Sequence, residues 1–249
     1  MNFYDILGYS STLALAVPVV VIVVLRLFHY NVFIALGAYY AFAFVYNLIT
    51  NNVIHVPENY RIVFSAINNM LEAPLVLFFL LYFSPSAAFA QKIRLAIAAL
   101  LAYALIVGIV IGFNRRSTVF VYLPGIILIL GISIHFFVQK TKQAITNSKH
   151  MGKAIMIAGI LFVYVSYAFL YVSHYLVLTP EVKDNFKIYY LSTTISALLV
   201  TMGILIERNR LKELREIQVT RKELARIYGD EEIKKAAPNG TASVWKEEF

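Results

Sequence analysis

The chain contains no cysteine among its 249 residues, and charged side chains make up only 14% of it. The absence of cysteine excludes disulfide bonds, thiolate metal sites and catalytic thiols. Hydrophobic residues, by contrast, make up 60% of the chain, and the mean hydropathy is +0.71. A soluble domain of this length has too little interior to hide so much apolar surface. The composition therefore indicates a membrane protein.

Seven mostly apolar runs follow one another with only short connections between them. Each run is close to the length of roughly 20 residues that crosses a hydrocarbon core as an α-helix. Because a backbone in lipid must satisfy its own hydrogen bonds, runs of this kind form helices. We therefore predict an all-α integral membrane protein whose seven-transmembrane-helix bundle occupies residues 1–206. The predicted spans are 11–28, 32–50, 62–83, 95–113, 118–138, 154–178 and 187–206.

Lysines and arginines near the span ends predict the orientation, since cytoplasmic connections carry an excess of both. With the N-terminus outside and the C-terminus cytoplasmic, fourteen of these residues lie on the inner side and five on the outer side. The inner set is Arg26, Lys92, Arg94, Lys140, Lys142, Lys149, Lys153, Arg208, Arg210, Lys212, Arg215, Arg221, Lys222 and Arg226. The outer set is Arg61, Arg115, Arg116, Lys183 and Lys187. The pair Arg115-Arg116 violates this bias locally.

The same bias bears on location and partners. Residues 1–12 contain no lysine or arginine, which disfavours a cleaved secretory signal. An α-helical bundle suggests a multi-pass protein of the inner, cytoplasmic-type cell membrane, in contact with membrane lipids. The net charge of +8 follows partly from the basic inner connections. No nucleic-acid-binding motif accompanies it, so we expect no nucleic-acid partner.

Beyond the last span, residues 207–235 are predicted to form a basic, amphipathic cytoplasmic helix. Residues 207–226 contain seven basic and four acidic side chains. Such a helix could lie on the anionic inner leaflet, at about 1 kcal/mol per basic side chain, or bind a cytoplasmic protein. Residues 236–249 are typical of a disordered tail. Apolar residues recur at roughly helical spacing at Leu211, Leu214, Ile217, Leu224 and Ile227.

The fourth predicted span carries three small residues at four-residue spacing: Ala104, Gly108 and Gly112. Such a face lets two helix backbones approach closely. Packing within the bundle is the favoured interpretation, and a homo-oligomer through this face is the alternative.

Glu72 is the only acidic residue inside a predicted span. An isolated carboxylate at that depth costs roughly 2.5–3.5 kcal/mol on insertion scales, so it needs a partner, a proton or water. We expect it to be neutral and hydrogen-bonded to Asn68, to Asn69 or to a tyrosine of the sixth span. Pro74 follows closely and frees the backbone carbonyl group of Met70. Pro18 and Pro124 are expected to disturb spans 1 and 5 in the same way.

Polar side chains at helical spacing predict where a binding site would form. They lie in spans 2, 3, 6 and 7, and the predicted orientation places nearly all of them between mid-membrane and the outer surface. We predict a pocket that opens outward between these four spans, with Glu72 as its floor, whereas spans 1 and 5 look almost bare. Hydrogen bonding that serves only packing is the alternative. The predicted ligand-binding residues are Asn47, Ser65, Asn68, Asn69, Glu72, Tyr167, Tyr171, His174, Ser192 and Ser196.

Cofactor chemistry finds little support in the sequence. His55, His174 and Glu72 lack the paired spacing that places two metal ligands on one helix face, so no metal site is predicted. A retinal protein needs a lysine in the middle of its last span. No lysine lies between Lys187 and Ile206, which excludes covalent retinal there. We expect no cofactor.

Three functions remain open at this stage. The favoured one is a sensor-like or receptor-like binding module for a small ligand or lipid. The second is a transporter or proton-coupled carrier that uses Glu72, disfavoured because no inverted repeat is visible. The third is an intramembrane lipid-modifying enzyme, for which neither a nucleophile nor a metal cluster is evident. An enzyme is therefore the less favoured class.

Overall fold

A computed structural model describes residues 3–112, 114–146, 150–175 and 182–228. These residues form helices and contain no β-strand. Seven helices are long and apolar enough to cross a membrane, which agrees with the seven predicted spans. The helices are α1 (Phe3–Val24), α2 (Asn31–Thr50), α3 (Glu58–Leu80), α4 (Ala87–Ile111), α5 (Arg115–Thr146), α6 (Met151–Tyr175) and α7 (Val182–Tyr228). Two short 3₁₀ helices, η1 (Leu27–His29) and η2 (Leu81–Phe83), follow α1 and α3.

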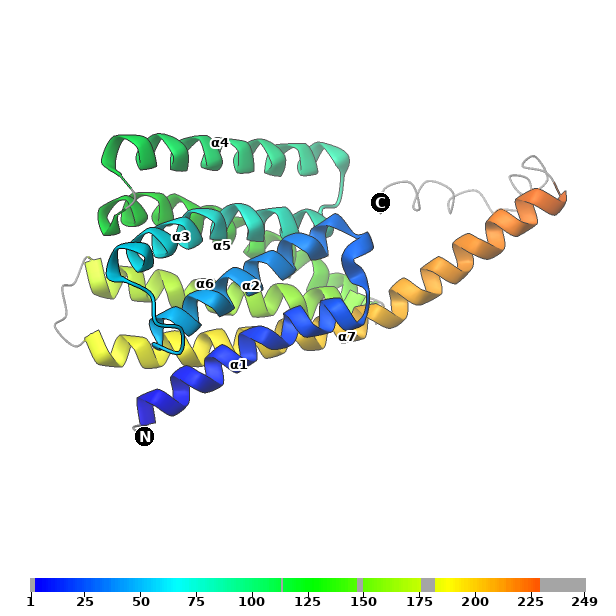
Figure 1. Cartoon of the computed structure of the whole chain (residues 1–249). Helices are drawn as coiled ribbons and strands as arrows, with labels where there is room; N and C mark the ends of the chain where they lie inside the picture. Colours follow the sequence, from blue (N-terminus) through cyan, green and yellow to red (C-terminus); the bar gives the residue numbers. More distant parts are fainter. Residues whose placement is uncertain (1–2, 113, 147–149, 176–181, 229–249) are drawn as a thin grey trace.

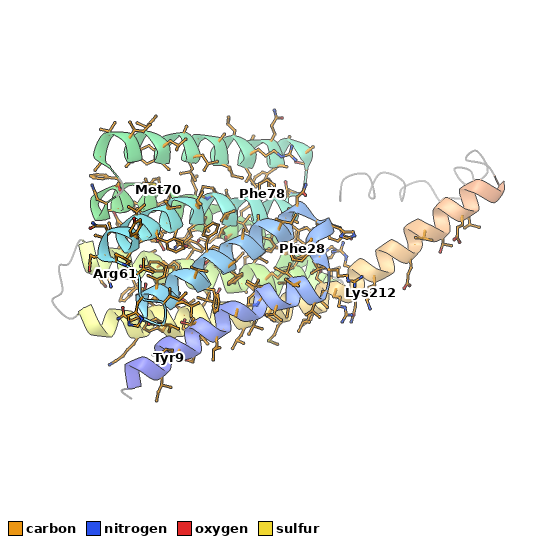
Figure 2. All side chains as sticks on the ribbon, viewed as in Figure 1. Tyr9, Phe28, Arg61, Met70, Phe78 and Lys212 are labelled. Atoms are coloured by element: carbon orange, nitrogen blue, oxygen red, sulfur yellow. The ribbon has the colours of Figure 1, made fainter. Side chains whose placement is uncertain are left out.

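Six of the seven helices form a closed ring. Each of α1, α2, α3, α5, α6 and α7 packs against its neighbours in this order, and α7 returns to contact α1. The remaining helix, α4, lies outside the ring against α3 and α5 (Figure 1). The short connections make consecutive helices neighbours. The side chains of the ring interior are therefore supplied mainly by six helices, and those of α4 project largely outward (Figure 2).

The last helix is much longer than the membrane-spanning segment predicted for it. α7 runs for 47 residues without a break at residue 206, where the sequence suggested a boundary between span and tail helix. Beyond the bundle it projects as a single rod, at the end opposite the N-terminus (Figure 1). The last predicted span, 187–206, and the 207–228 part of the tail helix are thus one continuous helix. Residues 229–235 and the predicted tail 236–249 lie outside the described residues.

Glycines allow close helix contacts between α6 and α7 and also between α5 and α3, where a Cβ atom added to Gly125 would lie 2.7 Å from Ala73 Cβ. A Cβ atom added to Gly203 would contact Met156 and approach the Gly152 carbonyl oxygen at 2.8 Å. One added to Gly159 would lie 3.0 Å from Val200 Cγ2. Small residues therefore allow these backbones to approach as membrane helices commonly do.

Part of the small-residue face of α4 packs against α3 and α5 of the same chain. Ala104 is buried with Met70, Val107 and Val121 in a small cluster between α4, α3 and α5, and Gly108 is also buried. Gly112 ends the helix with a positive φ of 84°, which favours glycine. This arrangement is the one expected of packing within the bundle, and a homo-oligomer through this face stays a prediction.

Candidate functional site

Glu72 lies on the inner face of α3, and two tyrosines from other helices hold one of its oxygens. The Tyr164 hydroxyl of α6 donates to Glu72 Oε1 at 2.8 Å, and the Tyr122 hydroxyl of α5 approaches the same oxygen at 3.4 Å. Tyr164 is only 1% exposed, so this contact is shielded from the surroundings. Donors from two helices therefore fix the carboxyl group inside the bundle.

The second carboxyl oxygen has a different environment. Among the described residues, Glu72 Oε2 accepts no hydrogen bond, and it is not among the fully enclosed polar atoms. The side-chain amide of Asn68, one turn away on α3, likewise makes no hydrogen bond among the described residues and is not fully enclosed. Both residues are nevertheless buried, Asn68 at 8% and Glu72 at 9% exposure. Buried polar groups in proteins normally have a partner or an ordered water. This side of Glu72 thus retains hydrogen-bonding capacity for another molecule.

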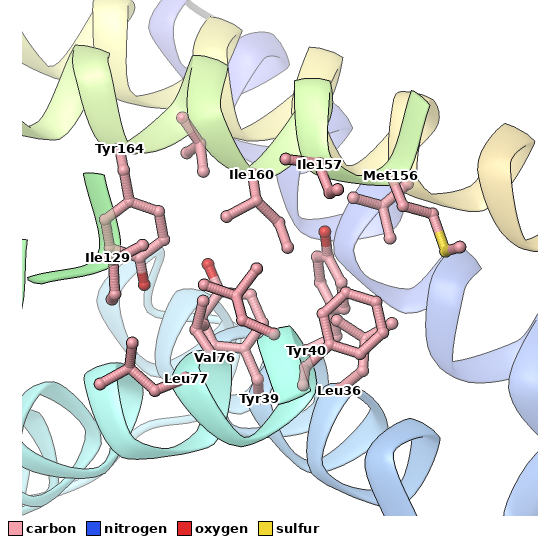
Figure 3. Packing of buried hydrophobic residues seen from close by; sticks show 14 of the residues in the cluster. Leu36, Tyr39, Tyr40, Val76, Leu77, Ile129, Met156, Ile157, Ile160 and Tyr164 are labelled. Atoms are coloured by element: carbon pink, nitrogen blue, oxygen red, sulfur yellow. The ribbon is translucent and has the colours of Figure 1, made fainter. Parts of the chain in front are cut away.

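Aromatic rings surround the carboxyl group. Tyr39 of α2 is buried in the same interior, in the cluster of side chains that Figure 3 shows together with Tyr164. The Tyr167 ring packs edge-on against Tyr164, with 5.5 Å between centroids, and stacks on Tyr189 of α7 at 5.6 Å. We call Tyr39, Tyr122, Tyr164, Tyr167 and Tyr189 the tyrosine cage. Together with Glu72 it draws on five helices: α2, α3, α5, α6 and α7.

Further hydrogen bonds tie the tyrosine cage to α2 and α7. The hydroxyl groups of Tyr167 and Thr193 are 3.2 Å apart, and the Asn47 amide donates to the Tyr189 hydroxyl at 3.3 Å. Asn47 Oδ1 is enclosed and has no hydrogen-bond partner among the described residues. Ser196 of α7 is buried, at 3% exposure. These contacts couple the position of α7 to the packing around Glu72.

The structure brings together some of the predicted ligand-binding residues and separates others. Asn68 and Glu72 are buried beside the tyrosine cage, whereas Ser65 and Asn69 on α3 are half-buried. Glu72 makes no hydrogen bond to either asparagine, and a tyrosine of the sixth span holds it instead. Their role in ligand binding stays a prediction.

Three other predicted residues have partners away from Glu72 or cannot be placed. The Tyr171 hydroxyl donates to the Val119 carbonyl oxygen at 3.4 Å, and that of Ser192 donates to the carbonyl oxygen of Tyr189 on its own helix. The side chain of His174 lies outside the described part of the structure. The predicted residues therefore do not form one continuous lining.

Of the tyrosine cage, the sequence analysis named only Tyr167, and it also expected a tyrosine of the sixth span beside Glu72. Span 5 looked almost bare, yet its Tyr122 reaches Glu72. Tyr39 of α2 was not predicted either. Tyrosine is frequent at membrane interfaces, so its presence in a span carries little information by itself. The useful signal would have been that a buried carboxyl group needs hydrogen-bond donors from neighbouring helices, which a tyrosine in span 5 can supply.

A second buried carboxylate, Glu207, lies where α7 leaves the bundle. It is 1% exposed, and its Oε1 accepts hydrogen bonds from the Tyr82 hydroxyl at 2.8 Å and from Arg210 at 2.9 Å. Its Oε2 has no hydrogen bond and would lie 3.0 Å from a Cβ atom on Gly152. Lys153 lies over the Tyr82 ring, 4.5 Å from the centroid. We call Tyr82, Lys153, Glu207 and Arg210 the exit cluster.

No metal-binding position is assigned. Within the described ranges, no three histidine, aspartate or glutamate side chains come together. Comparisons with family models, curated proteins and solved structures give no match to this chain. Its function must therefore be argued from the geometry around Glu72 and from the course of α7.

Proposed function

We propose that this chain is a sensor-like membrane binding module, whose site is the free side of Glu72 together with Asn68 and the tyrosine cage. The proposal rests on one observation: the two oxygens of the Glu72 carboxyl group differ in their hydrogen-bond partners. Oε1 is held by Tyr164 and Tyr122, while Oε2 keeps unused hydrogen-bonding capacity inside the bundle. Intramembrane ionisable residues held in this manner are expected to be functional.

The chemistry of the site favours a small ligand that donates hydrogen bonds. A carboxyl oxygen and an amide oxygen both accept, so an amine or a hydroxyl group would complement them. Aromatic faces around a carboxylate also attract cations, which favours a small amine over a neutral alcohol. The basic residues at the span ends predict the orientation of the bundle. In that orientation the polar side chains lie between mid-membrane and the outer surface, so we expect the site to open toward the outside.

The continuity of α7 supports a sensor-like role. Tyr189 belongs to the tyrosine cage, Thr193 contacts Tyr167, and the same helix continues to Tyr228 as the projecting rod. A ligand can shift a bundle between two states only if it binds one of them better than the other. A ligand that repositions Tyr167 or Tyr189 would move α7 directly. A cytoplasmic protein bound at residues 207–228 would then respond to the new position of the helix.

The experiment is a thermal-stability screen of the full chain in detergent against a set of small amines and matched alcohols. A compound present at one hundred times its Kd stabilises a folded protein by about 2.7 kcal/mol. We expect Glu72→Gln to abolish the stabilisation by amines, because the substitution removes the negative charge while preserving size. A Tyr164→Phe variant should weaken it, since Glu72 then loses its closer hydrogen bond.

Tyr103→Phe is the matched control, because Tyr103 donates to a backbone carbonyl on α5 rather than to Glu72. The proposal also expects amine-dependent changes in hydrogen exchange along residues 207–228, without transport across vesicles. Equal stabilisation of the wild type and Glu72→Gln would refute the proposed site. Amine flux that depends on Glu72 would replace the sensor by a carrier.

A further inference from the structure

An apolar groove of about 590 Å³ runs along the outside of the ring, between α4 and α5. Ala96, Ala99 and Tyr103 of α4 form one wall, Leu123 and Leu128 of α5 form the other, and Tyr171 of α6 lies at one end. Small alanines on α4 leave the space that larger side chains would fill. The groove is separate from the tyrosine cage, which lies on the inner side of α5.

Pro124 explains the polar end of the groove. Proline has no N–H group, so the carbonyl group of Phe120, four residues earlier, loses its helical donor. The Tyr103 hydroxyl replaces that donor at 3.3 Å, and the Tyr171 hydroxyl donates to the neighbouring Val119 carbonyl at 3.4 Å. Both hydroxyl groups lie near the start of α5. Toward Leu128 the walls are apolar.

The length and openness of the groove match one leaflet of a bilayer. From Val119 to Leu128 the helix rises about 14 Å at 1.5 Å per residue. Half of a hydrocarbon core about 30 Å thick is about 15 Å. Phe120 and Leu123 line the groove and are exposed. Both lie in a membrane-spanning segment, where the surrounding medium is lipid.

The sequence at the start of α5 indicates the kind of head group. Arg115 and Arg116 begin α5 one turn before Val119, and they are the pair that violates the predicted charge bias. Basic residues at a membrane surface attract anionic lipids. We propose that the groove binds one acyl chain of an anionic phospholipid, from the leaflet in which α5 begins, with the head group at the level of this arginine pair.

The experiment counts lipids that stay bound to the full chain after detergent extraction, by native mass spectrometry. Phosphatidylglycerol and phosphatidylcholine with identical chains are the two probes. We expect the wild type to retain one phosphatidylglycerol, and Ala99→Leu to lower its retention at least fivefold by filling the groove. Ala98→Leu is the matched control, because Ala98 is exposed on α4 but does not line the groove.

A second variant, Ala96→Val, fills the groove less severely and serves if Ala99→Leu unfolds, as judged by thermal unfolding. Replacing Arg115 and Arg116 by glutamine should reduce phosphatidylglycerol retention to the level of phosphatidylcholine. Equal retention by the groove-filling variants and Ala98→Leu would overturn the site. Equal retention of the two lipids by the wild type would overturn the anionic head group.

Discussion

Among the residues that the structure describes, two carboxylates are buried, and their partners differ in charge. Glu72 is held by neutral phenol groups at 2.8 and 3.4 Å, whereas Glu207 is paired with the guanidinium group of Arg210 at 2.9 Å. A buried carboxylate paired with a cation is already compensated. One held only by neutral donors has no cation beside it, so a cationic ligand can pair with it. This difference makes Glu72 the candidate binding residue and Glu207 the candidate anchor for α7.

Glu207→Gln should destabilise the protein by about 3 kcal/mol, because it removes the charge from an ion pair whose side chains, Arg210 and Glu207, are only 13% and 1% exposed. The matched control is Glu58→Gln. Its pair with Arg61 has the same i,i+3 spacing and a distance of 2.8 Å, but the side chains are 69% and 40% exposed. Its loss should cost less than about 1 kcal/mol. Reversible unfolding in mixed micelles measures both, and equal effects would contradict the anchoring role.

At the scale of the helices, the close contact between α6 and α7 depends on glycines that the sequence analysis did not single out. The four-residue pattern of Ala104, Gly108 and Gly112 drew attention to α4. The closest approaches between α6 and α7 instead involve Gly152, Gly159 and Gly203, at irregular spacing. A Cβ atom at Gly203 would meet backbone as well as a side chain, so the helices would have to separate.

Gly203→Ala is therefore expected to destabilise the bundle by about 1–3 kcal/mol, the usual cost of overpacking. Gly131→Ala is the control, because an added Cβ atom at Gly131 has no neighbour within 4 Å. Alanine is the better helix former by about 1 kcal/mol, so this variant should be neutral or slightly more stable. The same unfolding assay compares the two, and a stable Gly203→Ala protein would show that α6 and α7 can shift apart without loss.

For the whole molecule, the N-terminus and the α7 rod lie at opposite ends of the bundle, as seven crossings require (Figure 1). Since the native chain has no cysteine, single cysteines can report which end faces outward. We expect a membrane-impermeant maleimide to label Val53→Cys in intact cells and to label Lys212→Cys only after lysis. Both positions are exposed in the structure. The reverse pattern would invert the orientation and place the Glu72 site toward the cytoplasm.

The spans were predictable because their cause is local. A run of about 20 apolar residues must form a helix in lipid whatever surrounds it. The depth of Glu72 was predictable for the same reason. The end of the last span was not, because α7 continues through residue 206 into charged sequence without any change of conformation.

The sequence alone determined the class of this protein, its seven crossings and the presence of Glu72 within them, since length and hydropathy suffice for each. Tertiary structure decided which groups reach that acid. Helical periodicity sorts side chains into faces but leaves the rotation of each helix open, and packing sets that rotation. For this reason Tyr122 and Tyr164, rather than the neighbouring asparagines of α3, hold the carboxyl group, and Glu207 became a buried anchor.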